Sequence, residues 1–345
     1  MTILRATGPT RRVTAWCPRP QSLGAASGVS HDVVVETILH DEEVVELLSA
    51  ADAVGWMGEA IDAHHVGELV APPRVHTDFG DGRLVFTTGR LRGSWFGYRS
   101  YDSFPAEPGA QMVVVHDEAS GMLRAVAVGN ELGPRRVGAI GGVAAGALAA
   151  PDAHVAALIG TGTQAYTQMW ALAAIRDIRE VRVFSRDPQR RSAFVERIRT
   201  LVAGTVRTAL DARSACEGAE IVVLATSSPI PVIEAAWIGR GAYVTTLGPK
   251  QQGRAEFGLD LAEAASLLVT DSVDQIGAYD PPNILAGTSH GHRLVSLGAV
   301  RAGEAGTTAR DGISVFFSVG LGGTEVFLLD RLAAAIGQGP PGQTG

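Results

Sequence analysis

The 345-residue chain almost lacks lysine: Lys250 is the single example, and the other 28 of its 29 basic residues are arginine. It also lacks a basic excess, because its formal net charge is −7. A nucleic-acid binder needs a positive face to neutralise phosphates. The composition therefore argues against that class, and small-molecule chemistry is the favoured alternative.

Cysteine is scarce as well. Cys17 and Cys216 form neither a disulfide framework nor a metal-ligand spacing, which indicates either a reducing cytoplasm or indifference to redox state. The pair His290 and His292 lies in a glycine-rich stretch without a third candidate ligand nearby. No metal site is predicted.

Long apolar runs are missing too. The most hydrophobic one, 137–150, ends at Pro151, short of the roughly 20 residues that cross a bilayer. Its glycines and alanines suit a tightly packed buried helix, so no membrane span is expected. Residues 1–30 are interpreted as a flexible N-terminal arm, because prolines interrupt any apolar segment behind Arg11 and Arg12.

The pattern of strands changes near the middle of the chain. Before residue 130, short β-branched or aromatic runs such as LVFTTGRL alternate with turns, which predicts a largely antiparallel sheet. After residue 150, apolar runs such as HVAALIG, EIVVLAT and AYVTTLG alternate with helical segments. Continuous apolar strands are typical of parallel sheets buried on both faces, so this part predicts a doubly wound α/β domain.

The stretch from Gly160 to Ala165, GTGTQA, has the form G-x-G-x-x-A between a predicted strand and a predicted helix. The first glycine permits a tight turn, the second lets a pyrophosphate approach, and the helix N-terminus faces the phosphate charge. We expect this turn to bind a dinucleotide through five residues: Gly160, Thr161, Gly162, Thr163 and Gln164.

The end of the following strand indicates which dinucleotide is bound. An acid at this place would hold the ribose 2′-hydroxyl of NAD. Here Ser185 and Arg186 occupy it, with Arg190 a helical turn later, and guanidinium groups suit a 2′-phosphate. Asp187 is interpreted as the N-cap of the next helix. NADPH is therefore expected rather than NADH. Further cofactor contacts are predicted at Thr226, Ser227, Ser228, Leu247 and Val319.

Several ordered motifs together resemble the ornithine cyclodeaminase/μ-crystallin family: PPR at 72–74, GYRSYDSFP, DEASGMLRAV, GTGTQA with SRDP, and SVGL at 318–321. The resemblance covers about residues 39–335. It implies an α/β fold in which a Rossmann domain (136–311) is inserted into a discontinuous α+β domain (31–135 with 312–345). That second domain binds substrate and forms a homodimer. The chemistry implied is hydride exchange between a nicotinamide and the Cα of an amino or imino acid.

The resemblance also implies roles for individual residues. Arg74 and Arg136 match arginines that grip a substrate carboxylate in relatives. Arg99 stands where relatives have a catalytic lysine, and Lys250 stands where cyclodeaminases have an aspartate. Arginine is a poor proton donor, so Arg99 is expected to act as an electrostatic clamp.

Lys250 follows a predicted strand whose end should face the ligand crevice. Burial and neighbouring arginines would lower its pKa, which suits a general acid or base; an anion anchor and a solvated loop lysine remain alternatives. Tyr98 or Tyr101 is a possible second proton donor. Trp95, on the same predicted strand face as Arg99, could form an aromatic wall, with strand packing as the alternative. Glu325 is interpreted as an acid in the first turn of a helix.

These residues predict a cytoplasmic, homodimeric, NADPH-dependent reductase of C=N bonds, either an imine or ketimine reductase or an amino-acid dehydrogenase that acts on α-imino or keto acids. Two alternatives stay open. One is an amino-acid cyclodeaminase of the ornithine type with tightly bound NAD. The other is a crystallin-like protein that binds NADPH and a small ligand without catalysis. A cation at Lys250 disfavours a substrate with a positively charged side chain.

Overall fold

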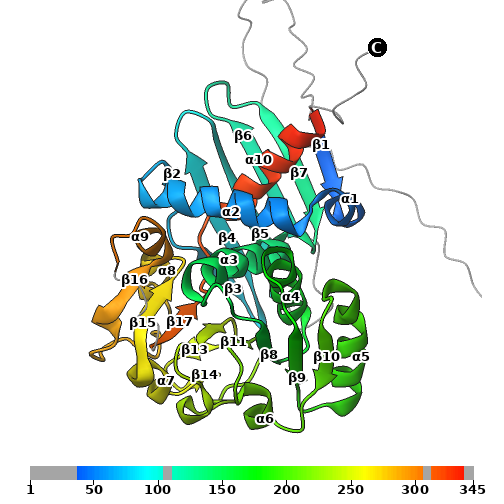
Figure 1. The fold of residues 1–345 in the computed structure, drawn as a ribbon. Helices are drawn as coiled ribbons and strands as arrows, with labels where there is room; N and C mark the ends of the chain where they lie inside the picture. The colour runs from blue at the N-terminus through cyan, green and yellow to red at the C-terminus, as the bar shows by residue number, and fades with distance from the viewer. Residues whose placement is uncertain (1–36, 104–110, 306–311, 338–345) are drawn as a thin grey trace, which may run out of the picture. The chain divides into compact units, whose positions relative to one another are not determined.

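Two sheets organise the residues that the computed structural model describes, namely 37–103, 111–305 and 312–337 (Figure 1). These residues all belong to one compact unit. The expected N-terminal arm at 1–30 lies outside the described residues.

The first sheet is mixed and has the strand order β1-β7-β6-β5-β4-β2, with β3 also paired to β4. Its neighbours are antiparallel except β1 and β7. Its strands are β1 (Thr37–His40), β2 (Leu69–Val70), β3 (Val75–Phe79), β4 (Gly82–Leu91), β5 (Trp95–Asp102), β6 (Gln111–Asp117) and β7 (Leu123–Gly129).

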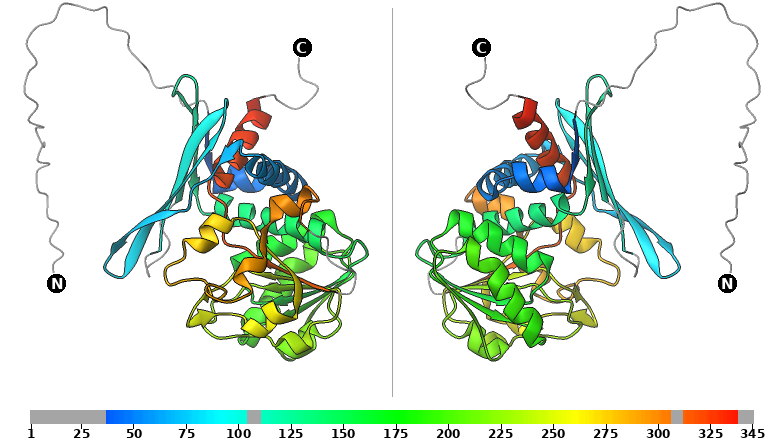
Figure 2. Two further views of the ribbon diagram at one scale, coloured as in Figure 1. Left: turned by 90° about the vertical axis from the view of Figure 1, so that its left-hand side faces the viewer. Right: turned by 90° about the vertical axis from the view of Figure 1, so that its right-hand side faces the viewer.

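Helices α2 (Ala50–His65) and α10 (Thr324–Gly337) lie on one side of this sheet, and no described helix covers the other side (Figure 2). Because side chains alternate along a strand, Trp95 on β5 faces α10 and packs edge-on against Phe327, with ring centroids 6.2 Å apart. Its neighbour Phe96 points to the uncovered side and is 40% exposed.

The second sheet is parallel and has the order β10-β9-β8-β11-β12-β17-β15-β16. This is the doubly wound arrangement, with its topological switch between β8 and β11. Its strands are β8 (Val155–Ile159), β9 (Glu180–Phe184), β10 (Thr205–Thr208), β11 (Ile221–Leu224), β12 (Tyr243–Thr246), β15 (Ala265–Thr270), β16 (Leu294–Ser296) and β17 (Ile313–Phe317).

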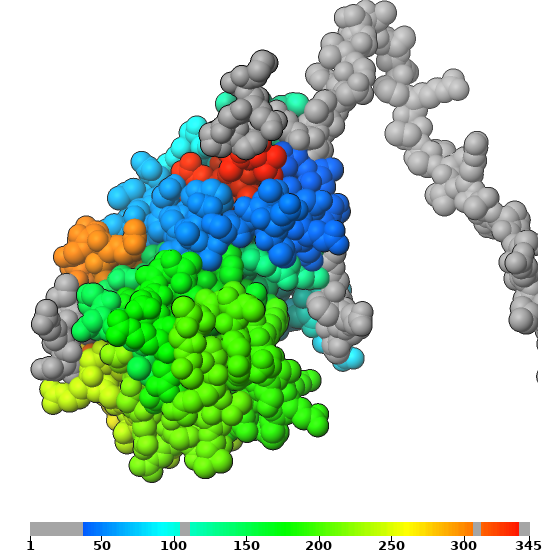
Figure 3. All heavy atoms as spheres, turned by 45° about the vertical axis from the view of Figure 1, so that its right-hand side comes forward, coloured from blue at the N-terminus to red at the C-terminus, as the bar shows by residue number. Residues whose placement is uncertain are grey.

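The remaining helices surround the parallel sheet or join it to the mixed one. Helix α3, the predicted glycine- and alanine-rich helix, packs between α2 and α4, and small residues allow this close approach. Figure 3 shows the blue surface, which includes α2, directly against the green surface that includes α4. The other helices are α1 (Asp41–Leu47), α3 (Leu132–Leu148), α4 (Thr163–Ile175), α5 (Pro188–Ile198), α6 (Ala212–Cys216), α7 (Leu259–Ala264), α8 (Val273–Gly277) and α9 (Leu297–Arg301), with single turns η1 (Arg199–Leu201), η2 (Ala235–Trp237) and η3 (Gly291–Arg293).

The predicted fold class is confirmed, and one boundary differs from expectation. Strand β17 belongs to the segment assigned to the α+β domain, yet it lies inside the parallel sheet between β12 and β15. Its sequence ISVFF is buried throughout, as a central parallel strand requires. The chain therefore returns to the mixed sheet only after Phe317. Within the described residues, every helix is too short or too polar to span a bilayer.

Candidate active site

Two cavities meet beyond the carboxyl ends of β8, β11 and β12, where open α/β sheets bind ligands. The glycine-turn cleft, of about 1010 Å³, follows the loop after β8. The inner cavity, of about 560 Å³, lies between the parallel sheet and strands β3 to β5. Gln164, Leu247 and Gly248 line both, so the cleft and the cavity are continuous at these residues.

The glycine turn has the geometry that its sequence predicts. Gly160 has φ = +118°, and a side chain there would collide with the carbonyl of Ala225. Gly162 faces open space, which leaves room for a phosphate at the N-terminus of α4. The Oε1 atom of Gln164 is buried without a hydrogen-bond partner, as expected of a group awaiting a ligand. These features fit a dinucleotide.

Most residues predicted to contact the cofactor line this cleft. Thr163, the first residue of α4, does not line it, and Val319 lines the inner cavity instead. The predicted residues found in the cleft are Gly160, Thr161, Gly162, Gln164, Ser185, Arg186, Arg190, Thr226, Ser227, Ser228 and Leu247.

Asp187 caps α5, as interpreted from the sequence: its carboxylate accepts hydrogen bonds from the backbone N–H groups of Gln189 and Arg190 at 2.9 and 3.1 Å. The Nε atom of Arg190 lies 3.7 Å from the same carboxylate. Asp187 also lines the cleft, next to Arg186. One acid and two guanidinium groups therefore line the cleft at the loop after β9.

Glu256, which sequence reasoning did not single out, fixes the floor of the cleft. Its fully buried carboxylate accepts hydrogen bonds from the backbone N–H groups of Thr226, Leu247 and Gly248 and from the Thr226 hydroxyl, at 2.6 to 3.1 Å. It thereby ties together the loops after β11 and β12. A buried acid ten residues beyond the end of β12 carries no local signal of this role.

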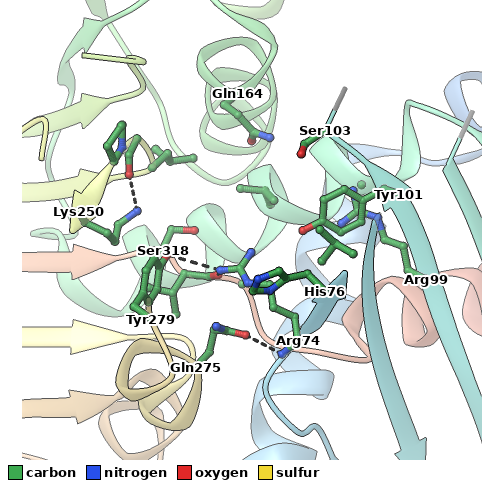
Figure 4. A pocket seen from close by; sticks show the side chains of 18 of the residues that line it. Arg74, His76, Arg99, Tyr101, Ser103, Gln164, Lys250, Gln275, Tyr279 and Ser318 are labelled. Atoms are coloured by element: carbon green, nitrogen blue, oxygen red, sulfur yellow. Dashed lines mark hydrogen bonds between the residues drawn. The ribbon is translucent and has the colours of Figure 1, made fainter. Parts of the chain in front are cut away.

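Arg74, the residue directly before β3, points into the inner cavity (Figure 4). Its backbone N–H donates to Gln275 of α8 at 2.9 Å, and its Nη2 donates to the Val319 carbonyl at 2.9 Å. The guanidinium also lies over the Tyr279 ring, 5.7 Å from its centroid. Neutral partners thus position Arg74, and its charge stays available to a ligand.

Arg99 and Arg136 converge on one buried carboxylate, that of Glu325 in the first turn of α10. Arg99 Nη1 donates to Glu325 Oε1 at 2.6 Å, and Arg136 Nη2 donates to the same oxygen. Glu325 is 0% exposed. Burial by itself raises the pKa of Glu325, but the two guanidinium groups outweigh it and hold the pKa below its ordinary value. The expectation of a simple helix-terminal acid therefore missed its main contacts.

Arg99 and Arg136 differ in which of their guanidinium N–H donors remain without a hydrogen-bond partner. Arg99 also donates to Gln111 and stacks on Tyr101, with its guanidinium carbon 4.2 Å from the ring centroid. Arg136 keeps Nε and Nη1, both buried without a partner. Since buried polar groups are normally paired, these two donors indicate a place for an oxygen ligand.

Lys250, in the short strand β13 (Lys250–Gln251) paired with β14 (Arg254–Ala255), lines the inner cavity and is 2% exposed. Its Nζ donates to the Gly248 carbonyl at 2.7 Å, close to the junction with the glycine-turn cleft. Burial lowers the pKa of Lys250 to about 8; Glu256 and Asp271 partly offset this effect, and Arg74 adds to it.

This environment corrects one expectation. Burial is the largest cause of the lowered pKa, and Arg74 is the one neighbouring arginine that adds to it. Arg99 and Arg136 share the charge of Glu325 instead. A solvated loop lysine, one of the alternatives, is inconsistent with the burial.

The aromatic residues of β5 divide between two environments. Tyr101 lines the inner cavity, opposite Lys250 (Figure 4). Trp95 is 0% exposed in the core against Phe327 and does not line it, so its predicted role as an aromatic wall is corrected to strand packing. Tyr98 alternates to the other face of the strand from Arg99 and also lies outside the cavity lining, which corrects its expected role as a proton donor.

Sequence reasoning also missed the α8 side of the cavity. The buried carboxylate of Asp271 accepts from the backbone N–H groups of Val319 and Gly320, at 2.9 Å each, and so shapes the SVGL loop. Gln275 and Tyr279 hold Arg74. Among the described residues, no cluster of three metal-ligating side chains exists.

A parallel-sheet cleft that opens into an arginine-lined cavity is typical of dinucleotide-dependent oxidoreductases. The chain belongs to the ornithine cyclodeaminase/mu-crystallin family, whose model matches residues 34–330. The resemblance drawn from the sequence is therefore confirmed.

Several known proteins are similar to this chain. The chain is 29% identical to the alanine dehydrogenase of Archaeoglobus fulgidus over 82% of this chain and 90% of that one. It is 28% identical to a Δ1-pyrroline-2-carboxylate reductase of Bacillus cereus, over 64% and 69% of the two chains. A solved archaeal alanine dehydrogenase dimer with bound NAD superposes with a TM-score of 0.78 at 26% identity, over 88% and 97% of the chains. Two other curated relatives are matched over 50% of their length.

Proposed function

We propose that this protein is an NADPH-dependent reductase of C=N bonds that acts on α-imino acids, or equivalently interconverts α-amino and α-keto acids. The observation that carries the proposal is the position of Lys250: its Nζ lies in an arginine-lined cavity, next to the residues that this cavity shares with the glycine-turn cleft. Relatives that reduce a cyclic imine or act on alanine support the same reaction class.

Arg74 and Arg136 bind the substrate carboxylate in this proposal. Both have guanidinium donors beyond those used in protein contacts, and a guanidinium pair orients a carboxylate strongly. Arg99 is held by Glu325, Gln111 and Tyr101. It therefore contributes positive charge rather than a free pair of guanidinium donors.

A bound reduced nicotinamide supplies the hydride to the imine carbon. Lys250 then donates a proton to the imine nitrogen, so that the C=N bond becomes CH–NH. Its low pKa, near working pH, suits it to give this proton and to take it back in the oxidative direction. Tyr101 is the remaining candidate for a second donor.

The preference for NADPH rests on the loop after β9. Arg186 and Arg190 both line the cleft, while the carboxylate of Asp187 is engaged by the α5 backbone. We therefore assign the 2′-phosphate to Arg186 and Arg190, with Ser185 as a further donor. The solved alanine dehydrogenase neighbour, in contrast, carries NAD.

Replacing Arg186 with alanine should raise the KM for NADPH about ten- to a hundredfold and leave the KM for NADH almost unchanged, because a charge-assisted hydrogen bond to the 2′-phosphate is lost. Steady-state kinetics with both cofactors measures this. Arg199→Ala, which removes an exposed guanidinium paired with Glu196, is the matched control. Equal loss with both cofactors would contradict the assignment.

The reaction itself is tested by following NADPH absorbance with cyclic imino acids, with keto acids plus ammonia or amines, and with ornithine. A reductase consumes one NADPH per product. A cyclodeaminase releases ammonia from ornithine without net cofactor change, and a ligand-binding protein shows binding without turnover. Either of the last two results would overturn the proposal.

We further propose that a second copy of the chain covers the open side of the mixed sheet. This side carries Ile38, Phe86, Phe96 and Met112 at 37 to 55% exposure. Apolar groups that gather on one exposed surface commonly mark an interface. The alanine dehydrogenase neighbour is a dimer.

A Phe96→Asp variant should therefore sediment with the mass of one chain at micromolar concentration, while the unaltered protein has twice that mass. The carboxylate would be buried without a partner at the centre of the interface. Leu210→Asp, at an apolar residue that is 86% exposed outside this sheet, is the matched control. A dimer that survives Phe96→Asp would locate the interface elsewhere.

A further inference from the structure

The cations of the inner cavity exceed the need of a single carboxylate. Arg99 is committed to Glu325 and Gln111, so Arg74 and Arg136 remain for the α-carboxylate. Lys250 is a third available cation, and it enters from the parallel-sheet side, whereas Arg74 and Arg99 come from the mixed sheet (Figure 4). A monocarboxylic substrate would place no anionic group against the ammonium group of Lys250.

The surroundings of Lys250 offer its Nζ no carboxylate within ion-pairing distance among the described residues. The two acids whose charges raise the pKa of Lys250 are bonded to other groups: Glu256 to Thr226, Leu247 and Gly248, and Asp271 to the SVGL loop. A buried ammonium group that is bonded to one neutral carbonyl is costly, because the low-dielectric surroundings do not replace its hydration. An anionic ligand group would remove that cost.

We propose that the substrate carries a second carboxylate, on its side chain, and that Lys250 Nζ binds it. The reaction would then act on short dicarboxylic imino and amino acids. This inference rests on the proposed function and deepens it. An ammonium group has three N–H donors, and one is used on Gly248. The other two can serve a side-chain carboxylate and the reacting nitrogen together.

Pairs of amino acids that differ in one group separate the effect of side-chain charge on activity from the effect of side-chain shape. L-aspartate and L-asparagine, and likewise L-glutamate and L-glutamine, have nearly the same shape, but the amide removes the charge. We measure the oxidative direction with NADP⁺. For whichever of aspartate and glutamate is the better substrate, we expect kcat/KM to exceed that of its amide by at least about thirtyfold, since hydrogen bonds to charged groups are worth roughly this factor. Equal or higher kcat/KM for both amides would overturn the inference while leaving the reductase assignment in place.

A binding experiment keeps the test independent of turnover. Succinate and succinamate, which cannot react, are titrated into the enzyme with bound NADPH while cofactor fluorescence is followed. Succinate should bind at least about tenfold more tightly than succinamate. Lys250→Met should abolish this difference, and Lys250→Arg, which keeps the charge, should retain it. A preference that survives in Lys250→Met would place the second carboxylate on another cation. If every amino and imino acid fails to react but succinate selectivity follows Lys250, the proposed reaction falls and the dicarboxylate site stands.

Discussion

Replacement of Glu325 with glutamine is expected to lower the free energy of unfolding by about 3–5 kcal/mol at neutral pH. Glu325 is the carboxylate that Arg99 and Arg136 share, and all three side chains are largely withdrawn from water. A neutral amide of the same shape would leave two guanidinium groups facing each other without a counter-charge. Their repulsion and lost hydration are the source of the loss.

Chemical denaturation with urea measures the change. Glu59→Gln is the matched control, because Glu59 pairs with Arg331 at 2.6 Å on the surface, where an ion pair contributes at most about 1 kcal/mol. Similar losses in the two variants would contradict the role assigned to Glu325.

The pH dependence of the Glu325→Gln effect has a definite sign. The pKa of Glu325 is lower in the folded protein than in the unfolded chain, so its charge stabilises the fold above the ordinary glutamate pKa. That contribution is lost as pH falls through the folded value. The difference between the unaltered protein and the variant should therefore be greatest near neutrality and shrink in acid.

Features that depend on neighbouring residues could be predicted from the sequence. The glycine turn needs a strand, two glycines and a helix in succession, and all of these lie within residues 154–175. The cap at Asp187 is equally local. The sequence also predicts the parallel sheet, because its strands are continuous apolar runs.

Features that depend on distant residues could not be predicted this way. Glu325 lies 226 residues from Arg99 and 189 from Arg136 in the chain, so its neighbours alone suggest a helix-terminal acid. Strand alternation places Trp95 and Arg99 on the same face of β5. It does not indicate that α10 covers this face at Trp95 and leaves it open to the cavity at Tyr101. The family resemblance identified Arg74 and Arg136 as carboxylate ligands. How their roles differ from that of Arg99 depends on which guanidinium donors have no protein partner, and the sequence does not show this.

Replacement of Lys250 with methionine is expected to reduce kcat/KM for imine reduction about 10²- to 10⁴-fold, the usual contribution of a positioned proton donor. Methionine fills a similar buried volume without a charge, so the cavity should keep its shape.

The pH profile separates proton donation from simple binding. Burial lowers the pKa of Lys250 to about 8, so the ammonium form needed for reduction prevails below this pH and is lost above it. We expect kcat/KM for reduction to be level up to about pH 8 and to decline beyond it, and kcat/KM for oxidation to rise through the same range, because oxidation needs the neutral amine. A bound side-chain carboxylate would move the corresponding break in kcat to higher pH, since it favours the ammonium form.

Lys250→Met should eliminate that break in both directions. Lys250→Arg should bind a dicarboxylate but lose the turnover that depends on proton transfer, because arginine keeps its proton throughout this range. If the methionine variant instead retains the break near pH 8, another group in the cavity handles the proton, and Lys250 is left with the binding of an anion alone. Tyr101 would then be the next residue to replace, because it lines the cavity opposite Lys250 and has a hydroxyl that can donate a proton.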